Sequence, residues 1–318
     1  MNILDEIAGA KTIAITGHVN PDGDCLGSTL GTYNYILANR EDIGKEDIDL
    51  FLGHYEKVFE YMPNIAEAKD TIIEGKHYDV TIVLDCSDTK RIEPFISCYD
   101  NADKVIWIDH HKELEDYGTV RLVDEDISSA SELLYSCLED SKINKDVATC
   151  IYTGIIHDTG VFKYESVNSK TMNVAGKMLE YGIDKTAIID NTFYAKTYIQ
   201  NQILGRALLE SFLFFDGKCI ASVITKDIMD FYGVTGVEMG GVVEQLRLTS
   251  GVEVALFLYQ KDDNLYKLSL RSKSIVDVAK IANSFGGGGH IRAAGADVSG
   301  KPHDIINSVS ALIAEQMD

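Results

Sequence analysis

Short apolar runs alternate with segments of helical periodicity through the first half of the chain. The apolar runs lie at Lys11–Gly17, Asp47–Gly53, Tyr78–Leu84, Lys104–Ile108 and Gly118–Val123. Runs of this length between polar residues predict buried strands. Apolar positions three and four residues apart predict helices after Asp24, over Ser128–Leu138 and over Lys145–Asp158. Strands and helices in alternation predict a helix-covered, mainly parallel sheet.

Beyond a helical segment at Asp184–Gln202, the pattern changes. Strand patterns follow at Lys218–Thr225, Val252–Gln260 and Leu265–Arg271, and a short amphipathic helix at Val276–Phe285. The last two strands are separated by four polar residues, which predicts a hairpin. A chain of 318 residues is long enough for two domains. We expect a domain with the parallel sheet at residues 1–185, a helical connector at 186–204 and a smaller α/β domain at 205–318.

Acidic residues and histidines follow several of the predicted strands directly. They are His18, Asp22 and Asp24 after the first strand, Asp85 after the third, Asp109, His110 and His111 after the fourth, and Asp158 at a helix end. Open α/β sheets place their ligands at the carboxyl ends of the strands. A carboxylate such as Asp85, directly after a buried strand, is costly unless it is paired or binds a metal. Imidazole and carboxylate together suit a divalent metal with mixed nitrogen and oxygen ligands.

Ordinary structural roles explain some of the same residues. Pro21-Asp22-Gly23 is also a turn in which the aspartate caps the helix that follows. Asp88 suits a turn or a helix cap better than a metal site, and His157 points away from the apolar helix face. The first loop alone leaves a metal site and a helix cap equally open. The triplet Asp109-His110-His111 after a core strand favours the metal site.

Four consecutive glycines, Gly286–Gly289, precede His290 and Arg292 in the second half of the chain. Such a run is either a flexible linker or a backbone nest that approaches a phosphate closely. Its position between a helix and further patterned sequence favours the nest. Arg271, at the end of a predicted strand, is either a second anion clamp or a surface charge.

The net charge of −21 limits the partners of the chain. Proteins that track long nucleic acids carry a basic stripe. The sequence has none, so a phosphate-bearing substrate is expected to be short. No window is apolar enough for a membrane span, and Asp5 and Glu6 stand where an export signal is basic. Six scattered cysteines without a C-x-x-C pair predict a cytoplasmic protein without disulfides.

Five motifs occur in order along the chain: GHVNPDGDCLGS (17–28), VLDCSD (83–88), DHH (109–111), HDTG (157–160) and FGGGGHIRAAG (285–295). Together they resemble the DHH phosphoesterase superfamily, and in particular its two-domain members with the type-1 DHH-associated C-terminal domain. By length and motif the chain is most similar to the group of bifunctional oligoribonucleases (nanoRNases) and pAp phosphatases. The motifs span nearly the whole chain.

The resemblance implies a site for two Mn²⁺ ions, with Mg²⁺ or Co²⁺ as substitutes. The implied ligands are His18, Asp22 and Asp85 for one ion and Asp24, Asp85, His110 and Asp158 for the other, with Asp85 bridging. Asp109 would support the site, and His111 would face the substrate as a general acid or a phosphate contact. Two ions held in this way activate a bridging water and clamp the phosphoryl oxygens during in-line attack.

The resemblance also implies hydrolysis of short oligoribonucleotides to mononucleotides, and of pAp to AMP, in a cleft between the two domains. The residues implied in substrate binding are Arg271, Gly287, Gly288, Gly289, His290 and Arg292. Lys163 stands where relatives often carry arginine, and lysine lacks the planar fork of a bidentate phosphate contact. We also expect a homodimer, and we expect neither a membrane nor a long nucleic acid as a partner.

Other activities on the same framework stay open. A phosphodiesterase for c-di-AMP or pApA has the same layout. The C-terminal glycine and histidine motif argues against a manganese pyrophosphatase, and the net charge argues against a processive exonuclease. An alanyl-tRNA editing protein would not need the first four motifs. A catalytically silent nucleotide-binding regulator would lack a metal ligand, and every implied ligand is present.

Overall fold

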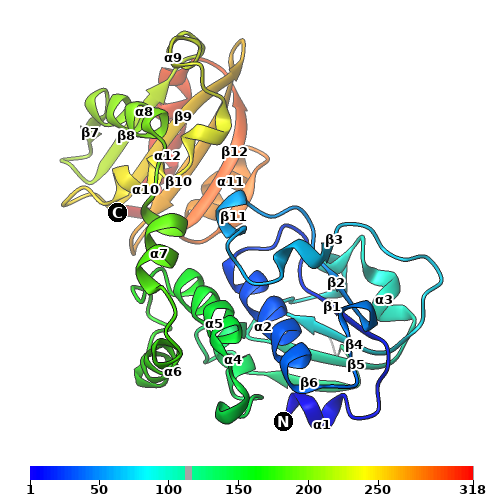
Figure 1. The fold of residues 1–318 in the computed structure, drawn as a ribbon. Helices are drawn as coiled ribbons and strands as arrows, with labels where there is room; N and C mark the ends of the chain where they lie inside the picture. The colour runs from blue at the N-terminus through cyan, green and yellow to red at the C-terminus, as the bar shows by residue number, and fades with distance from the viewer. Residues whose placement is uncertain (112–116, 318) are drawn as a thin grey trace. The chain divides into compact units, whose positions relative to one another are not determined.

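The computed structural model describes residues 1–111 and 117–317. The chain forms two compact units, Met1–Ala195 and Lys196–Asp318, and each contains one sheet (Figure 1). The division falls inside the segment for which the sequence predicts a helical connector, residues 186–204. Helices lie on both sides of the division and belong to different units.

The sheet of unit 1 has six strands in the order β3-β2-β1-β4-β5-β6. They are β1 (Ile13–Thr16), β2 (Ile48–Phe51), β3 (Ala68–Lys69), β4 (Tyr78–Leu84), β5 (Ala102–Asp109) and β6 (Val120–Val123). The pairings between these strands are all parallel, which confirms the predicted α/β class. Because β1, β4 and β5 are neighbours, their carboxyl ends lie side by side at one edge of the sheet.

Helices and short 3₁₀ turns connect these strands. The helices are α1 (Ile3–Glu6), α2 (Gly23–Asn39), α3 (Ile96–Asp100), α4 (Ala130–Tyr135), α5 (Lys145–Asp158), α6 (Ser169–Glu180), α7 (Lys185–Ile189) and the π-helical turn η6 (Asp190–Tyr194). The 3₁₀ turns are η1 (Lys45–Asp47), η2 (Lys57–Phe59), η3 (Ile65–Glu67), η4 (Thr89–Ile92) and η5 (Asp140–Lys142). The helix predicted over Lys145–Asp158 has the observed bounds of α5, and α4 lies inside the predicted segment Ser128–Leu138.

Both faces of this sheet are buried. Ile13 and Ile15 of β1 belong to the large core that α2 and α5 complete. Ala14, between them, faces the other side of the sheet and packs in a cluster with Phe51, because side chains alternate along a strand. A sheet that is covered on both faces needs apolar residues at successive positions. This requirement explains why its strands are uninterrupted apolar runs in the sequence.

Helix α2 packs closely against α5, and nearly all of its residues are buried. The approach is too close for a side chain at two positions. A Cβ on Gly27 would lie 2.7 Å from the carbonyl oxygen of Cys150, and a Cβ on Gly154 would lie 2.6 Å from Asp24 Oδ1. These two glycines therefore set the distance between Asp24, near the start of α2, and Asp158, at the end of α5.

The sheet of unit 2 has six strands in the order β11-β12-β10-β9-β8-β7. They are β7 (Phe212–Phe214), β8 (Cys219–Ile224), β9 (Val254–Asp262), β10 (Leu265–Ser272), β11 (Gly288–His290) and β12 (Ala293–Ser299). The pairing of β8 with β9 is parallel and the other pairings are antiparallel, so the sheet is mixed. The helical elements are α8 (Tyr198–Leu209), α9 (Lys226–Tyr232), η7 (Gly236–Met239), α10 (Val242–Arg247), α11 (Val278–Ser284) and α12 (Pro302–Met317).

Helices cover both faces of this second sheet as well. One core contains Leu268 and Leu270 of β10 together with residues of α11 and α12. The other contains Phe257 of β9 together with residues of α8 and α10. The predicted hairpin is present as β9 and β10. Strands β7, β11 and β12 are not predicted by the sequence pattern, since the first is short and the other two are rich in glycine and alanine.

All six cysteines are buried and none forms a disulfide. Within residues 1–111 and 117–317, no helix combines the length and the apolar character that crossing a membrane requires.

We expect Gly154→Ala to lower the stability of the protein by about 1–3 kcal/mol, because its methyl group would collide with Asp24 and with the side chain of Ser131. The matched control is Gly176→Ala in the exposed face of α6, where no atom lies within 4 Å of the new Cβ. That change should raise stability by about 0.5–1 kcal/mol, since alanine favours the helix. Chemical denaturation of both variants measures the two effects. A Gly154→Ala protein as stable as its parent contradicts the close approach.

Candidate active site

The residues that follow β1, β4 and β5 come together at the carboxyl edge of the sheet of unit 1. His18 Nε2 lies 3.5 Å from Asp85 Oδ2 and 3.8 Å from Asp22 Oδ1. Asp22 also caps α2, because its Oδ1 accepts the backbone N–H groups of Asp24 and Cys25. The two roles that the sequence leaves open for Asp22 are thus compatible in one side chain.

His110 connects the acids on the other side of Asp85. Its Nε2 lies 3.6 Å from Asp85 Oδ1, 3.4 Å from Asp158 Oδ2 and 3.9 Å from Asp24 Oδ2. These contacts bring β4, β5, α2 and α5 to one point. All six residues for which the sequence predicts metal binding lie in this cluster.

Asp85 occupies the centre of the cluster, between His18 and His110. It is 2% exposed, and its backbone has a left-handed φ of 52°. Aspartate and asparagine adopt this region more readily than other residues with a side chain. Among the described residues, Asp85 Oδ1 and Asp109 Oδ2 are buried without a hydrogen-bond partner. An orphaned carboxylate oxygen of this kind is the acceptor that a cation would satisfy.

The acids are held in place by backbone donors. The carboxylate of Asp24 accepts the N–H of Ala130 at 2.6 Å and the N–H of Ser131 at 3.0 Å. These donors stand in the first turn of α4, whose N-cap is Ser129. Ser129, as the N-cap of this helix, thus orients the turn toward Asp24, which is 1% exposed.

The pKa values show how crowded the charges are. Burial opposes the positive charge of His18, but the carboxylates of Asp22 and Asp85 raise its pKa to about 10. Burial likewise opposes the positive charge of His110, but the carboxylates of Asp85 and Asp24 raise its pKa to about 10. Burial raises the pKa of Asp158 to about 6 and, with the charge of Asp85, that of Asp24 well above its usual value. The acids therefore need positive charge beside them.

The donor set fits divalent metals. Ligand atoms of Asp24, His110 and Asp158 lie within 4.8 Å of one another, and so do those of Asp85, His110 and His111. A third group within the same distance consists of His18, Asp85 and Cys25. Two imidazoles among several carboxylates match manganese and similar ions in ligand type. Cys25, for which the sequence predicts no role, is fully buried beneath this cluster.

Asp109 and His111 form a hydrogen-bonded pair beside these groups. Asp109 Oδ1 accepts the backbone N–H of His110 at 2.9 Å and His111 Nδ1 at 2.8 Å. Because an ionised carboxylate only accepts, His111 carries its proton on Nδ1 in this arrangement. Asp109 is fully buried, whereas the His111 side chain is 39% exposed. Asp109 therefore orients an imidazole whose other nitrogen, Nε2, has no hydrogen-bond partner among the described residues.

A left-handed turn follows Asp158 directly. Gly160, Val161 and Phe162 have φ values of 56°, 56° and 63°. A β-branched residue such as Val161 rarely adopts this conformation. The backbone N–H of Val161 donates to the Ile156 carbonyl at 2.7 Å, which helps to hold the turn. The sequence signals this turn only through Gly160, since Val161 and Phe162 favour extended or helical backbone.

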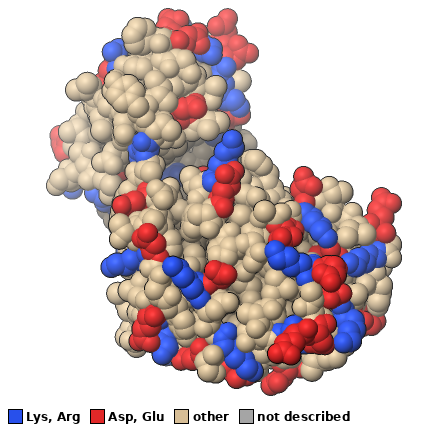
Figure 2. Space-filling view, in the orientation of Figure 1, with Lys and Arg blue, Asp and Glu red and all other residues tan. Residues whose placement is uncertain are grey.

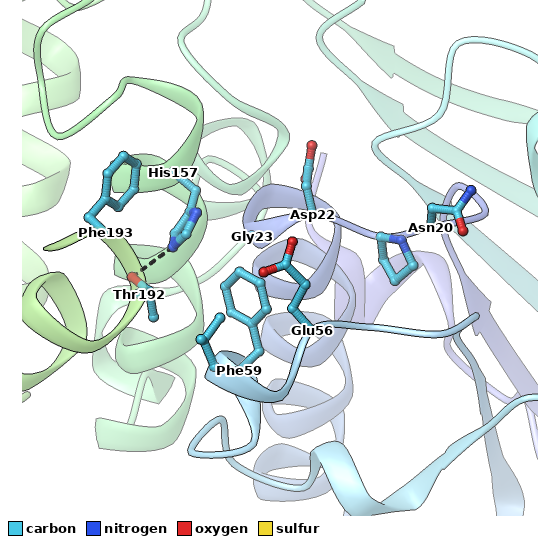
Figure 3. A pocket seen from close by; sticks show the side chains of 10 residues that line it. Asn20, Asp22, Gly23, Glu56, Phe59, His157, Thr192 and Phe193 are labelled. Atoms are coloured by element: carbon cyan, nitrogen blue, oxygen red, sulfur yellow. Dashed lines mark hydrogen bonds between the residues drawn. The ribbon is translucent and has the colours of Figure 1, made fainter. Parts of the chain in front are cut away.

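His157, which the sequence assigns a structural role, contacts two aromatic rings at tilted angles and lies beside the start of α2 (Figure 3). Its ring centroid lies 4.9 Å from that of Phe59 and 4.7 Å from that of Phe193, and its Nε2 lies 2.9 Å from Thr192 Oγ1. Burial lowers its pKa to about 4. A Cβ on Gly23 would lie 2.2 Å from the His157 ring, so the start of α2 packs directly against this imidazole.

In unit 2, the residues predicted to bind substrate lie on β10, on β11 and directly beside β11, and β12 separates the two strands. Both His290 of β11 and Arg271 of β10 pair with Ala293 of β12 in the sheet register. Paired residues project to the same face, and neighbouring strands are about 4.8 Å apart. Gly288 pairs with Gly295 on that same face. The result is a flat platform of small residues with a cationic side chain on one side and a histidine on the other.

The glycines of this platform differ in whether the fold leaves room for a side chain. A Cβ on Gly287 would lie 2.2 Å from the Gly295 carbonyl oxygen, and a Cβ on Gly289 would lie 2.5 Å from that of Ala293. At Gly288 the nearest atom is Asn283 Oδ1 at 3.7 Å. Part of the glycine run therefore serves the β11–β12 pairing, and Gly288 does not.

Arg292 and Arg271 also make contacts within unit 2. The Arg292 guanidinium donates to the carbonyl oxygens of Val276 and Ser274. Arg271 donates to the Leu270 carbonyl at 2.9 Å and lies 4.0 Å from Glu244. The binding of substrate by these two residues stays a prediction.

Two family profiles match the chain, one within each unit. The profile described as the DHH family, N-terminal domain, matches residues 12–155, and that of the DHHA1 domain matches residues 216–316. The chain is 28% identical over 301 residues to the bifunctional oligoribonuclease and PAP phosphatase NrnA of Bacillus subtilis, covering 93% of this chain and 92% of that protein. It is 29% identical over 300 residues to the probable bifunctional oligoribonuclease and PAP phosphatase NrnA of Streptococcus mutans, with coverage of 93% and 92%.

A solved structure has a similar fold over nearly the whole chain. The exopolyphosphatase-related protein of Bacteroides fragilis superposes with a TM-score of 0.84 at 25% identity, over 98% of this chain and 94% of that one. The metal-type donors lie within residues 12–158, and the glycine platform lies within the DHHA1 match. The chain therefore contains an N-terminal domain of the DHH family, followed by a DHHA1 domain.

Proposed function

We propose that the protein is a manganese-dependent phosphoesterase that hydrolyses short oligoribonucleotides to mononucleotides and pAp to AMP. The observation that carries this proposal is the convergence of six metal-type ligands with Asp85 at their centre, whose Oδ1 has no hydrogen-bond partner among the described residues. The relatives named above as oligoribonucleases and PAP phosphatases, aligned over most of their length, support the substrate class.

His18, Asp22 and Asp85 would hold one ion, and Asp24, Asp85, His110 and Asp158 would hold the other. Bound divalent ions supply a nucleophile of lowered pKa and neutralise phosphoryl charge. Asp24 is fixed by the N–H groups of Ala130 and Ser131, so it needs little reorganisation to bind. Asp85 faces both histidines at once, which suits a bridging ligand.

His111 would act on the substrate rather than hold a metal. Asp109 fixes its Nδ1 proton at 2.8 Å and so presents Nε2 as the free nitrogen. When His111 is protonated, Nε2–H can donate to the leaving oxygen or to a phosphoryl oxygen. Asp109 keeps the ring oriented through either step and stabilises its positive charge.

The platform in unit 2 would bind the phosphate or base end of a short substrate. Arg271 supplies positive charge, His290 a second donor, and Gly288 leaves room for a phosphate to approach the backbone. Residues 196–318 contain 12 Lys and Arg against 14 Asp and Glu, so most of the net charge of −21 lies in unit 1. Acidic and basic side chains are interspersed on the face seen in Figure 2, which is unlike the basic stripe of a protein that tracks long strands.

The substrate assignment predicts a specific pattern of turnover. Metal-stripped protein should be inactive, and added manganese should restore release of mononucleotides from 5′-pApA and from a five-nucleotide RNA, and of phosphate from pAp. Chromatography of the products, with c-di-AMP and pyrophosphate in the same panel, measures this pattern. Faster cleavage of c-di-AMP than of pApA would favour a cyclic-dinucleotide phosphodiesterase instead. Turnover of pyrophosphate alone would refute the proposal.

Asp85→Asn should reduce manganese-dependent turnover by at least about 100-fold, because a bridging oxygen loses its charge. Asparagine accepts the left-handed φ of residue 85, so the fold should persist. Calorimetric titration with manganese and thermal unfolding separate loss of metal from loss of structure. The control is Asp88→Asn, since Asp88 caps η4 and asparagine caps equally well. A folded Asp85→Asn protein with normal turnover would exclude the bridging role.

Substitutions at two neighbouring glycines distinguish an effect on substrate binding from an effect on the stability of unit 2. Gly288→Ala should leave thermal unfolding unchanged and raise KM for pApA by about tenfold or more, because its methyl group stands where a phosphate would approach. Gly287→Ala should lower stability by about 1–3 kcal/mol, since its Cβ meets the Gly295 carbonyl. Steady-state kinetics and thermal unfolding of both variants measure the difference. An unchanged KM in Gly288→Ala contradicts binding at the platform.

A further inference from the structure

A pocket of about 330 Å³ opens beside the metal-type cluster, wholly within unit 1 (Figure 3). Its lining residues are Asn20, Pro21, Asp22, Gly23, Glu56, Val58, Phe59, His157, Thr192 and Phe193. The volume lies at the lower end of the range of about 300–1,000 Å³ for small-molecule sites. Asp22 lies 3.8 Å from His18 Nε2, so a group in the pocket is adjacent to the phosphoryl group undergoing reaction.

One wall of the pocket is aromatic and fixed in position. His157 packs against Phe59 and Phe193 with tilted rings, and its Nε2 forms a hydrogen bond with Thr192 Oγ1. Gly23 packs against the imidazole so closely that no Cβ fits. This wall offers a rigid apolar surface for the body of a sugar or a base.

The charged groups of the lining are both acids, Asp22 and Glu56, and no lysine or arginine stands among the ten lining residues. Such a lining repels phosphate and favours a neutral group rich in hydrogen-bond donors. Asp22 is occupied as the N-cap of α2. The Glu56 carboxylate, by contrast, is exposed and makes no hydrogen bond or ion pair within the described part of the chain. It is therefore available to accept bonds from a ligand.

We propose that this pocket binds the ribose next to the scissile phosphate, and that Glu56 accepts a hydrogen bond from its 2′-hydroxyl group. A carboxylate is a common acceptor for ribose hydroxyls in nucleotide sites. The pocket then takes the uncharged part of the nucleotide while the metal-type cluster takes the phosphate. Glu56 is thus a specificity-determining residue that favours ribonucleotides over deoxyribonucleotides. This inference rests on the proposed function and names how the same site selects its substrate.

The test compares 5′-pApA with its 2′-deoxy analogue in the manganese-loaded protein. Glu56→Ala should lower kcat/KM for the ribose substrate by roughly 10- to 100-fold, the range for a lost hydrogen bond to a charged group, and mainly through KM. Turnover of the deoxy substrate should change little. Glu56→Gln, which keeps an acceptor oxygen, should retain part of the preference.

The matched control is Glu60→Ala, which removes a neighbouring exposed carboxylate outside the pocket. Removing negative charge near an anionic substrate should, if anything, strengthen binding, so a general charge effect has the opposite sign. Equal loss for both substrates in Glu56→Ala, or loss of manganese binding in a titration, would overturn the assignment and leave the proposed function intact.

If the parent protein turns over neither dinucleotide, the proposed function fails. Binding of AMP and 2′-deoxy-AMP, measured by calorimetry on the same proteins, then decides the role of the pocket separately. Tighter binding of AMP that depends on Glu56 supports the ribose site, and equal binding of the two nucleotides contradicts it.

Discussion

The burial of several carboxylates at one point is the constraint on which unit 1 depends. Asp24, Asp85 and Asp109 are at most 2% exposed, and two of their oxygens have no hydrogen-bond partner among the described residues. Buried carboxylates lose their hydration, and the surrounding structure must offset the free energy that this loss costs. Backbone N–H groups of α4 serve Asp24, imidazoles flank Asp85, and His111 together with the His110 backbone serves Asp109. Bound cations complete the compensation in the proposed enzyme.

The same constraint explains unusual features of the backbone nearby. Asp85 takes a left-handed conformation directly after β4, and three successive residues take it after Asp158. Position 154 is a glycine, and the absence of a side chain there lets the Asp24 carboxylate pack against α5. Conformations of this kind cost free energy and persist where the rest of the structure enforces them. Their concentration around one set of acids indicates that the fold is built to hold those acids together.

Much of this architecture follows from the sequence. The runs at β1, β4 and β5 are apolar because both faces of the sheet are covered, and the acids that follow them must then meet at one edge. What the pattern does not show are features set by distant contacts. Strands β11 and β12 are glycine- and alanine-rich, so their pairing has no signature of alternation. The pocket beside Asp22 is likewise absent from any local pattern, because Glu56, His157 and Phe193 come from three separate segments.

The uneven distribution of charge has a consequence for the order of events in a catalytic cycle. Unit 1 carries most of the net charge of −21, whereas unit 2 is close to balance. The negative field of unit 1 raises the local concentration of divalent cations and repels anions. Hydrolysis of a phosphodiester creates an additional negative charge on the products. In the proposed reaction the acidic unit would therefore disfavour the products more strongly than the intact substrate, so the same charge that is expected to exclude long strands would also speed product release.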